Sequence, residues 1–238
     1  MIPGFTKDTD FQQGAILLIN KPYGWTSFSV VNKIKHLIRK AKGYKKLKVG
    51  HAGTLDPLAT GLLVICIGKA TKLVETFIND DKEYVATFRL GQTTPSFDME
   101  TQMNQEFPID HITVDLVEQT VKGFLGEQNQ IPPLFSAKFV QGKRAYDLAR
   151  QGVEMELKPV KIFFHELEII KFELPNLTLR VRCSKGTYIR SLARDLGVAL
   201  NSGAYLADLV RIGSGDFKLS DAEELTEFEK IFRDNVTN

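Results

Sequence analysis

The chain has 238 residues, of which 43% are hydrophobic and 25% are charged, and its formal net charge is only +2. This composition is typical of a globular protein with room for one large domain or two small ones, and so small a net charge says nothing about nucleic acid. The longest apolar run is too short to span a bilayer, and the N-terminus lacks the basic-then-apolar order of a secretion signal. We therefore expect a cytoplasmic protein without a membrane segment.

The charges are distributed unevenly along the chain. Residues 11–55 contain nine Lys or Arg and no acid, whereas residues 221–238 contain six acids and two bases. This asymmetry indicates a cationic face for a polyanion. The two cysteines, Cys66 and Cys183, are far apart and belong to no Cys-x-x-Cys or His/Cys cluster, so we predict neither a zinc site nor a disulfide framework.

The N-terminal third predicts a strand, a turn and a basic helix. Residues 1–13 are polar and irregular and are interpreted as a loose leader, and residues 15–20 as a short buried strand. Thr26 or Ser27 can cap the following helix, in which apolar residues recur at helical spacing as far as Ala41. The cations of this helix form either a solvated face or, with the lysines of residues 42–48, an edge that neutralises phosphates.

The middle of the chain predicts alternating strands and helices. We expect a buried strand at 62–67, a helix at 70–78, a half-buried strand at 84–90 and a helix at 112–125 that ends at Gly126. The candidates for the buried side of the last helix are Val114, Leu116, Val117, Val121 and Leu125.

The C-terminal half begins with the irregular, Pro-containing stretch 131–138 and a basic helix at 142–150, then strands at 161–172 and 177–183. Thr187 is expected to cap a helix with Arg190 and Arg194 on one face, residues 204–212 lead into a last strand, and an acidic helix starts at 221–224. We find no repeat or linker that requires a domain boundary. The pattern predicts an α+β fold with a large mixed sheet, and one domain over residues 14–238.

The stretch that carries chemistry is GHAGTLDPLATGLL, at residues 50–63. It contains three glycines, a proline, His51 and Asp56, and Asp56 is the first acid after Asp10. An Asp before a Pro is often just a turn residue or a helix cap. A carboxylate on a loop held by a buried strand is also how a nucleophile or a general base is presented, so both interpretations stand on the residues alone.

The same stretch resembles the signature loop of the TruB family of tRNA pseudouridine synthases, whose catalytic aspartate would fall on Asp56. Three further motifs agree in order and spacing: KPYGWTS at residues 21–27, KEY at 82–84 and GTYIRSL at 186–192. The resemblance extends from about Gly14 to Phe217. It implies the pseudouridine synthase fold, a large, mostly antiparallel mixed sheet flanked by helices with a catalytic cleft.

The resemblance also implies the roles of the site residues. Arg190 would pair with Asp56, Tyr84 would stack on the uracil, and Tyr188 and Leu209 would line the same pocket. Lys21 and Pro22 would support the pocket floor. His51 is a satisfied loop histidine, a general base or a wedge that fills the space of the flipped nucleotide, and the resemblance favours the wedge.

The implied reaction is the isomerisation of uridine 55 in the T-loop of tRNA, by a monomer that binds the T-arm and uses no cofactor and no metal. Asp56 could attack ribose C1′, stabilise positive charge there, or remove a neighbouring proton. A covalent intermediate and an elimination intermediate both remain open, as do a synthase for another RNA and a module that only binds or folds tRNA. The family also implies that residues 131–152 close on RNA and that the C-terminal RNA-binding domain of many relatives is missing here.

Overall fold

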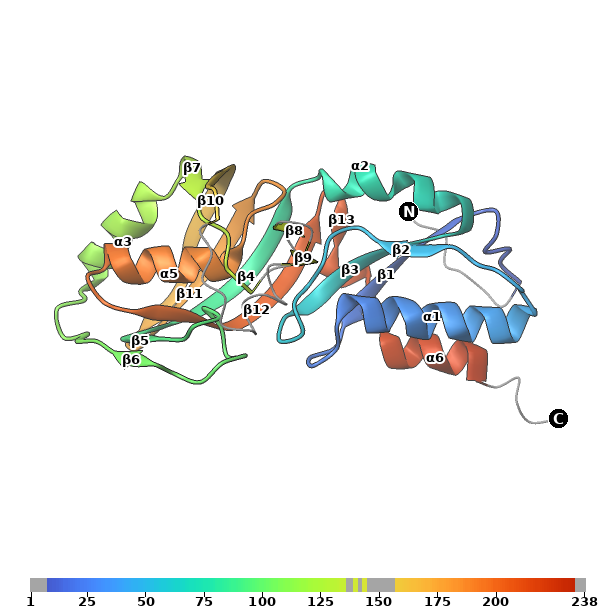
Figure 1. Cartoon of the computed structure of the whole chain (residues 1–238), viewed down its shortest axis with the longest axis horizontal. Helices are drawn as coiled ribbons and strands as arrows, with labels where there is room; N and C mark the ends of the chain where they lie inside the picture. The colour runs from blue at the N-terminus through green and yellow to red at the C-terminus, as the bar shows by residue number, and fades with distance from the viewer. Residues whose placement is uncertain (1–7, 136–138, 141–142, 145–156, 234–238) are drawn as a thin grey trace. The chain divides into compact units, whose positions relative to one another are not determined.

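The computed structural model describes residues 8–135, 139–140, 143–144 and 157–233, which divide into two compact units (Figure 1). The first unit contains residues 1–84 and 210–238, and the second contains residues 85–209. The secondary structure mixes helices and strands in both units, so the predicted α+β class is confirmed.

The first unit is built on the strand order β14-β1-β3-β12, from Glu223–Glu224, Ala15–Lys21, Thr60–Ile67 and Ala204–Ser214. Of β12, only the part from Val210 onward belongs to this unit. Strand β1 runs antiparallel to β3 and parallel to β14, and β12 runs parallel to β3. Strand β2 (Val49–His51) also pairs with β3, and β13 (Phe217–Lys218) pairs with β12. The sheet is therefore mixed, as predicted.

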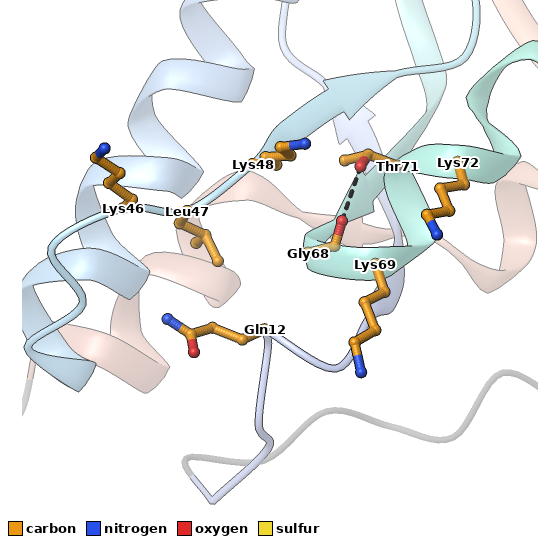
Figure 2. A pocket seen from close by; sticks show the side chains of 8 residues that line it. All are labelled: Gln12, Lys46, Leu47, Lys48, Gly68, Lys69, Thr71 and Lys72. Carbon is orange, nitrogen blue, oxygen red and sulfur yellow. Dashed lines mark hydrogen bonds between the residues drawn. The ribbon is translucent and has the colours of Figure 1, made fainter.

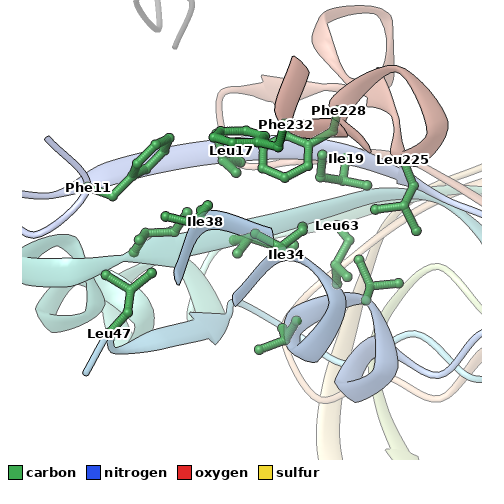
Figure 3. Close-up of a cluster of buried hydrophobic side chains, with 14 residues drawn as sticks. Phe11, Leu17, Ile19, Ile34, Ile38, Leu47, Leu63, Leu225, Phe228 and Phe232 are labelled. Atoms are coloured by element: carbon green, nitrogen blue, oxygen red, sulfur yellow. The ribbon is translucent and has the colours of Figure 1, made fainter. Parts of the chain in front are cut away.

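Helices α1 (Ser27–Lys42) and α6 (Leu225–Arg233) lie side by side on one face of β1 and β3 (Figures 1 and 3). The Thr26 side chain caps the N-terminus of α1 by accepting a hydrogen bond from the Ser29 N–H. Gly43, with the left-handed φ of 66°, caps its C-terminus. Figure 3 shows the core between helices and sheet, with Leu17 and Ile19 of β1 and Leu63 of β3 facing the helices. The opposite face of β3 is also buried, through Leu62 and Val64, which explains why the sequence of β3 is apolar throughout rather than alternating.

The second unit has the strand order β12-β4-β11-β10-β7. Besides β12, these strands are β4 (Lys82–Leu90), β11 (Asn176–Cys183), β10 (Val160–Glu173) and β7 (Gly126–Gln130). Strand β10 pairs antiparallel with both β11 and β7. Helices α3 (Val114–Gly123) and α5 (Ile189–Ala199) contact each other, and the two-stranded pairs are β5–β6 (Gln92–Thr93, Gln105–Glu106) and β8–β9 (Phe139–Val140, Lys143–Arg144).

Two predicted helices are shorter than expected. The segment predicted as a helix at 70–78 is a 3-10 helix at Gly68–Leu73 followed by α2 at Val74–Ile78. In the first turn of the 3-10 helix, the Thr71 hydroxyl donates to the Gly68 carbonyl. Helix α3 begins after its cap Thr113 and ends at Gly123, so the predicted end at Gly126 is wrong, and Gly126 instead begins a strand. The expected burial of Val114 and Leu125 is also wrong, because they are 56% and 43% exposed, whereas Val117 and Val121 are buried.

Three further boundaries differ from the prediction. Thr187 donates to the Ser184 carbonyl instead of capping, and Tyr188 is the residue that precedes α5. Residues 223–224 pair with β1, so the last helix begins at Leu225. Lys143–Arg144 belong to a strand, and the rest of the helix predicted at 142–150 lies outside the described residues, as does most of the segment 131–152.

Candidate active site

The loop that carries Asp56 joins β2 to β3 and is held on both sides of the aspartate. The Ser27 hydroxyl donates to the Leu55 carbonyl at 2.9 Å and accepts the Leu55 N–H at 2.8 Å. The Gly24 N–H donates to the Pro57 carbonyl at 2.9 Å. The motif at residues 21–27 is thus the frame that fixes the half-buried Asp56 in place.

Lys21 lies beneath this loop with its side chain fully buried. Its Nζ donates to three backbone carbonyls, those of Trp25 at 2.6 Å, Pro22 at 3.0 Å and Pro57 at 3.3 Å. Burial lowers the pKa of Lys21 to about 8, while the attraction of Asp56 acts in the opposite direction and the charge of Arg211 adds to the lowering. Lys21 therefore ties the loop together and places a positive charge near Asp56.

Arg211, on β12, is a buried cation that sequence reasoning missed. Its guanidinium donates to the Leu62 carbonyl at 2.6 Å and the Gly53 carbonyl at 3.1 Å, and it hydrogen-bonds Tyr84. Burial lowers its pKa, and Tyr84 opposes that effect. A Cβ at Gly61 (φ 99°) would overlap the Arg211 backbone, so this motif glycine allows β12 to approach β3 closely. The available signal in the sequence is an Arg between apolar residues of a predicted strand.

His51 ends β2, and the charge of Arg211 acts on its ring. Its Nδ1 is buried and hydrogen-bonds to no atom in the part of the chain that the structure describes. The pKa of His51 is lowered, mainly by burial and to a smaller extent by the charge of Arg211. A backbone contact with Gly53 has the opposite, weaker effect. The ring is therefore neutral at neutral pH, and the open nitrogen speaks against a fully satisfied loop histidine.

The role of Lys82 explains the KEY motif at residues 82–84. Lys82 is buried at the start of β4, and its Nζ donates to the Phe77 and Ile78 carbonyls at the end of α2 and to the Asp80 carbonyl just after the helix. A cation at a helix C-terminus satisfies carbonyls that have no partner within the helix. Lys82 thus anchors the strand that presents Tyr84, whose side chain is 8% exposed.

In the second unit, Arg190 projects from the first turn of α5 and is 5% exposed. Its Nε lies 3.6 Å from Oδ2 of Asp98, and its Nη1 donates to the Ser96 carbonyl at 3.4 Å. The other oxygen of Asp98 accepts the Glu100 N–H at 2.9 Å. The guanidinium is therefore oriented by a buried ion pair that sequence reasoning did not find, since Asp98 lies in an irregular loop.

Tyr188 lies just before Arg190, at the start of α5. The Gln130 side chain accepts the Tyr188 N–H at 2.8 Å and donates to the Tyr188 carbonyl at 3.1 Å. This two-point contact fixes the backbone of Tyr188 while its side chain is half-buried. Leu209, on β12, is 8% exposed.

In the first unit, Lys21, His51 and Tyr84 each interact with Arg211, and Lys21 also interacts with Asp56. The other predicted residues, Tyr188, Arg190 and Leu209, belong to the second unit, so the pairing of Asp56 with Arg190 stays a prediction. Within the described ranges, no three His, Cys, Asp or Glu side chains gather as metal ligands would. No helix among those described is both long and apolar enough to cross a membrane.

Comparison with known proteins identifies the class. Curated relatives named tRNA pseudouridine synthase B are 54% identical in Phocaeicola vulgatus, 55% in Bacteroides fragilis and 50% in Flavobacterium johnsoniae. These matches cover 92%, 92% and 93% of this chain and 93%, 94% and 97% of the relatives. The chain is thus a pseudouridine synthase, an isomerase, and its fold agrees with that class.

The family follows from a narrower match. Residues 39–189 match the N-terminal domain of the TruB family of pseudouridylate synthases, and the chain belongs to that family. A crystal structure of a Cbf5-Nop10-Gar1 complex gives a TM-score of 0.70 at 29% identity, covering 95% of this chain and 58% of that chain. A structure of an H/ACA RNP bound to a substrate RNA gives 0.67 at 28% identity, covering 92% of this chain and 53% of that chain. The predicted pseudouridine synthase fold is confirmed.

Proposed function

We propose that this protein converts uridine 55 in the T-loop of tRNA to pseudouridine, with Asp56 acting at ribose C1′. The proposal rests on one observation above the others: Asp56 is fixed on both sides by the segment 24–27, with the buried ammonium of Lys21 close to it. The names of the relatives, tRNA pseudouridine synthase B, support tRNA as the substrate.

The reaction needs a carboxylate and a pocket rather than a carrier of electrons or groups. The C1′–N1 bond breaks, the uracil turns, and a C1′–C5 bond forms, while C5 releases a proton and N1 takes one up. A carboxylate can attack C1′, stabilise the positive charge that develops there, or remove a neighbouring proton. Asp56 serves in one of these ways, and no cofactor or metal takes part.

Two cations are available to interact with the Asp56 carboxylate during the reaction. Lys21 contributes from the first unit, where its attraction to Asp56 is already felt. Arg190 contributes from the second unit, where Asp98 and the Ser96 carbonyl orient its guanidinium. We propose that Arg190 reaches the Asp56 carboxylate in the catalytic arrangement, because an oriented guanidinium can hold both oxygens of a carboxylate.

The target base must leave the folded RNA loop before it reaches Asp56. Tyr84 stacks on the uracil, and Tyr188 and Leu209 complete the apolar walls. His51, with a neutral ring at neutral pH, fills the space that the flipped nucleotide leaves. Lys21 and Pro22 support the floor, in keeping with the carbonyl contacts of Lys21.

The two units act together as one catalytic domain, residues 14–238, in a cytoplasmic monomer. Residues 131–152, of which most lie outside the described residues, close on the T-arm of the bound tRNA. These assignments extend the family resemblance to this chain.

The test is tritium release from a tRNA transcript labelled at uridine C5. We expect release with the wild-type protein and with Asp216→Asn, a matched change at an exposed carboxylate, but not with Asp56→Asn. A transcript with cytidine at position 55 should release no tritium even with the wild-type protein. Tight binding of tRNA by the wild-type protein without any release would overturn the proposal and leave a module that binds or folds RNA.

A further inference from the structure

Three segments of the first unit meet beside β2 and form a fixed frame. The Gly68 N–H donates to the Lys48 carbonyl at 2.9 Å, and the Lys69 N–H donates to the Gln12 carbonyl at 3.2 Å. Gly68 has φ 60°, and a Cβ there would overlap the carbonyls of Phe11 and Gln12. The loop before β2, the start of the 3-10 helix and residues 11–12 are therefore locked together by their backbones. Phe11 is also buried in the core, so the loose leader predicted at residues 1–13 does not extend to its last residues.

This frame encloses a pocket of about 290 Å³ (Figure 2). Eight residues line it, namely Gln12, Lys46, Leu47, Lys48, Gly68, Lys69, Thr71 and Lys72. Half of them are lysines and none is acidic. Leu47 is 6% exposed and packs in the core between sheet and helices, so the pocket wall is anchored in the hydrophobic core.

Four lysines around one open pocket, with no acid among its lining residues, raise the local positive potential and attract anions. The lysine side chains are exposed, and in the structure Lys69 donates to Gln13 at 2.6 Å, an interaction that an anion can replace. An ammonium is a compact charge with three donors on a flexible stem, which suits phosphate oxygens more than a planar recognition group. The chemistry therefore favours phosphate groups.

The position of the pocket indicates which phosphates. The pocket lies at the Gly68 end of β3, whereas the loop that carries Asp56 enters β3 at Thr60. The eight residues of β3, at a strand rise of about 3.3 Å each, put these two ends about 26 Å apart. An RNA that is bound at the Asp56 loop therefore needs several nucleotides to reach the pocket. A free polyphosphate has the same charge chemistry but no second contact at that loop.

We propose that the four-lysine pocket binds backbone phosphates of the substrate RNA and supplies affinity that does not depend on base sequence. This inference rests on the proposed function and goes beyond it, because it assigns RNA binding to a second site outside the catalytic loop. Contacts of this kind position the RNA without specifying a base.

The experiment compares Lys46→Gln/Lys69→Gln with a matched control, Lys122→Gln/Lys218→Gln, which removes two exposed lysines outside the pocket. Binding of tRNA is measured by fluorescence anisotropy against salt concentration. Removing one lysine that binds a phosphate should reduce the slope of log K against log salt by about 1, so the slope should fall by about 2 in the pocket variant and stay unchanged in the control. When salt rises from about 50 to about 200 mM, the tRNA affinity of the pocket variant should therefore fall by a factor about ten times smaller than that of the wild-type protein.

A second readout identifies the source of the phosphate. Inorganic tripolyphosphate should compete with tRNA for the wild-type protein and the control, and at least severalfold more weakly for the pocket variant. At saturating tRNA the rate of tritium release should be the same for all three proteins, while KM for tRNA rises only in the pocket variant. Thermal melting confirms that each variant is folded.

The outcomes separate this inference from the proposed function. If the pocket variant keeps the wild-type salt slope, the inference is wrong even when the enzyme forms pseudouridine. If tripolyphosphate binds the pocket but removing the lysines leaves the tRNA affinity unchanged, the site serves free phosphates and the RNA assignment is overturned. If the wild-type protein binds tRNA through the pocket but releases no tritium, the proposed catalysis fails while the phosphate site stands.

Discussion

Replacing Lys21 with Met measures what the buried ammonium contributes to the loop of Asp56. The change removes three hydrogen bonds to carbonyls. Bonds from a charged donor contribute about 1.5 to 3 kcal/mol each, or roughly 5 to 9 kcal/mol together. Against this, lowering the pKa from 10.5 to about 8 means that the charged form costs about 3 kcal/mol to bury. The hydrogen bonds outweigh that cost, so we expect Lys21→Met to destabilise the fold by about 3 kcal/mol at neutral pH.

The same pKa shift gives the pH dependence a definite sign. The folded pKa of Lys21 lies below the unfolded value, so the unfolded chain binds more protons between about pH 8 and pH 10.5. Stability from this group therefore rises with pH across that window, and the full cost of burying the charge is present below about pH 8. The advantage of the wild-type protein over Lys21→Met should grow by about 3 kcal/mol between neutral pH and pH 10.5.

Urea unfolding followed by circular dichroism, at neutral pH and near pH 10.5, measures both quantities. Comparing the two proteins at each pH cancels the titration of all other groups that the change leaves untouched. Lys218→Met, at an exposed lysine of the same unit, should show no difference at either pH. An advantage that stays constant or shrinks as the pH rises would refute the argument that burial dominates the pKa of Lys21.

Two further predictions concern the cations and partners that sequence reasoning did not place. Arg211→Met should destabilise the fold by about 3 kcal/mol in urea unfolding, because the Leu62 and Gly53 carbonyls are deprived of a buried donor, and the His51 pKa should rise in an NMR titration once the positive charge is gone. Asp98→Asn should cost about 3 kcal/mol by thermal melting, because it removes a counter-charge from buried Arg190, whereas Asp98→Glu keeps the charge and should cost less. An unchanged melting temperature in Asp98→Asn would contradict the second prediction.

The elements that a sequence predicts best are those in which local pattern and tertiary packing agree. Helix α1 has a capping Thr26, an apolar stripe and a terminating Gly43, and its observed bounds match the prediction within a residue. Both faces of β3 are covered in the fold, so the strand is apolar throughout, and this apolar run is what predicts a buried strand from the sequence. The motif around Asp56 is visible in the sequence because its glycines serve geometry that only they permit, as Gly61 does beside β12.

The contacts that could not be predicted join residues that no local pattern relates. Ser27 and Leu55 are 28 positions apart, Arg211 and Leu62 are 149, and Arg190 and Ser96 are 94. A charged residue in an apolar strand signals that it has a partner but not which one. The family motifs predict Asp56 as the partner of Arg190. They do not reveal Asp98, the carboxylate that pairs with Arg190 in the structure.

The role of His51 can be decided by separating the shape of its ring from its nitrogens. The ring is neutral at neutral pH because burial and Arg211 lower its pKa, so it can either stack in the RNA or accept a proton. His51→Phe keeps a flat aromatic ring without a nitrogen, and His51→Ala removes both. Stacking of one base on an aromatic side chain contributes about 1 to 3 kcal/mol, so a wedge predicts a fall in kcat/KM of roughly 5- to 150-fold for Ala and a small one for Phe. A general base instead predicts that Phe is as inactive as Ala, and that result, measured by tritium release, would refute the wedge.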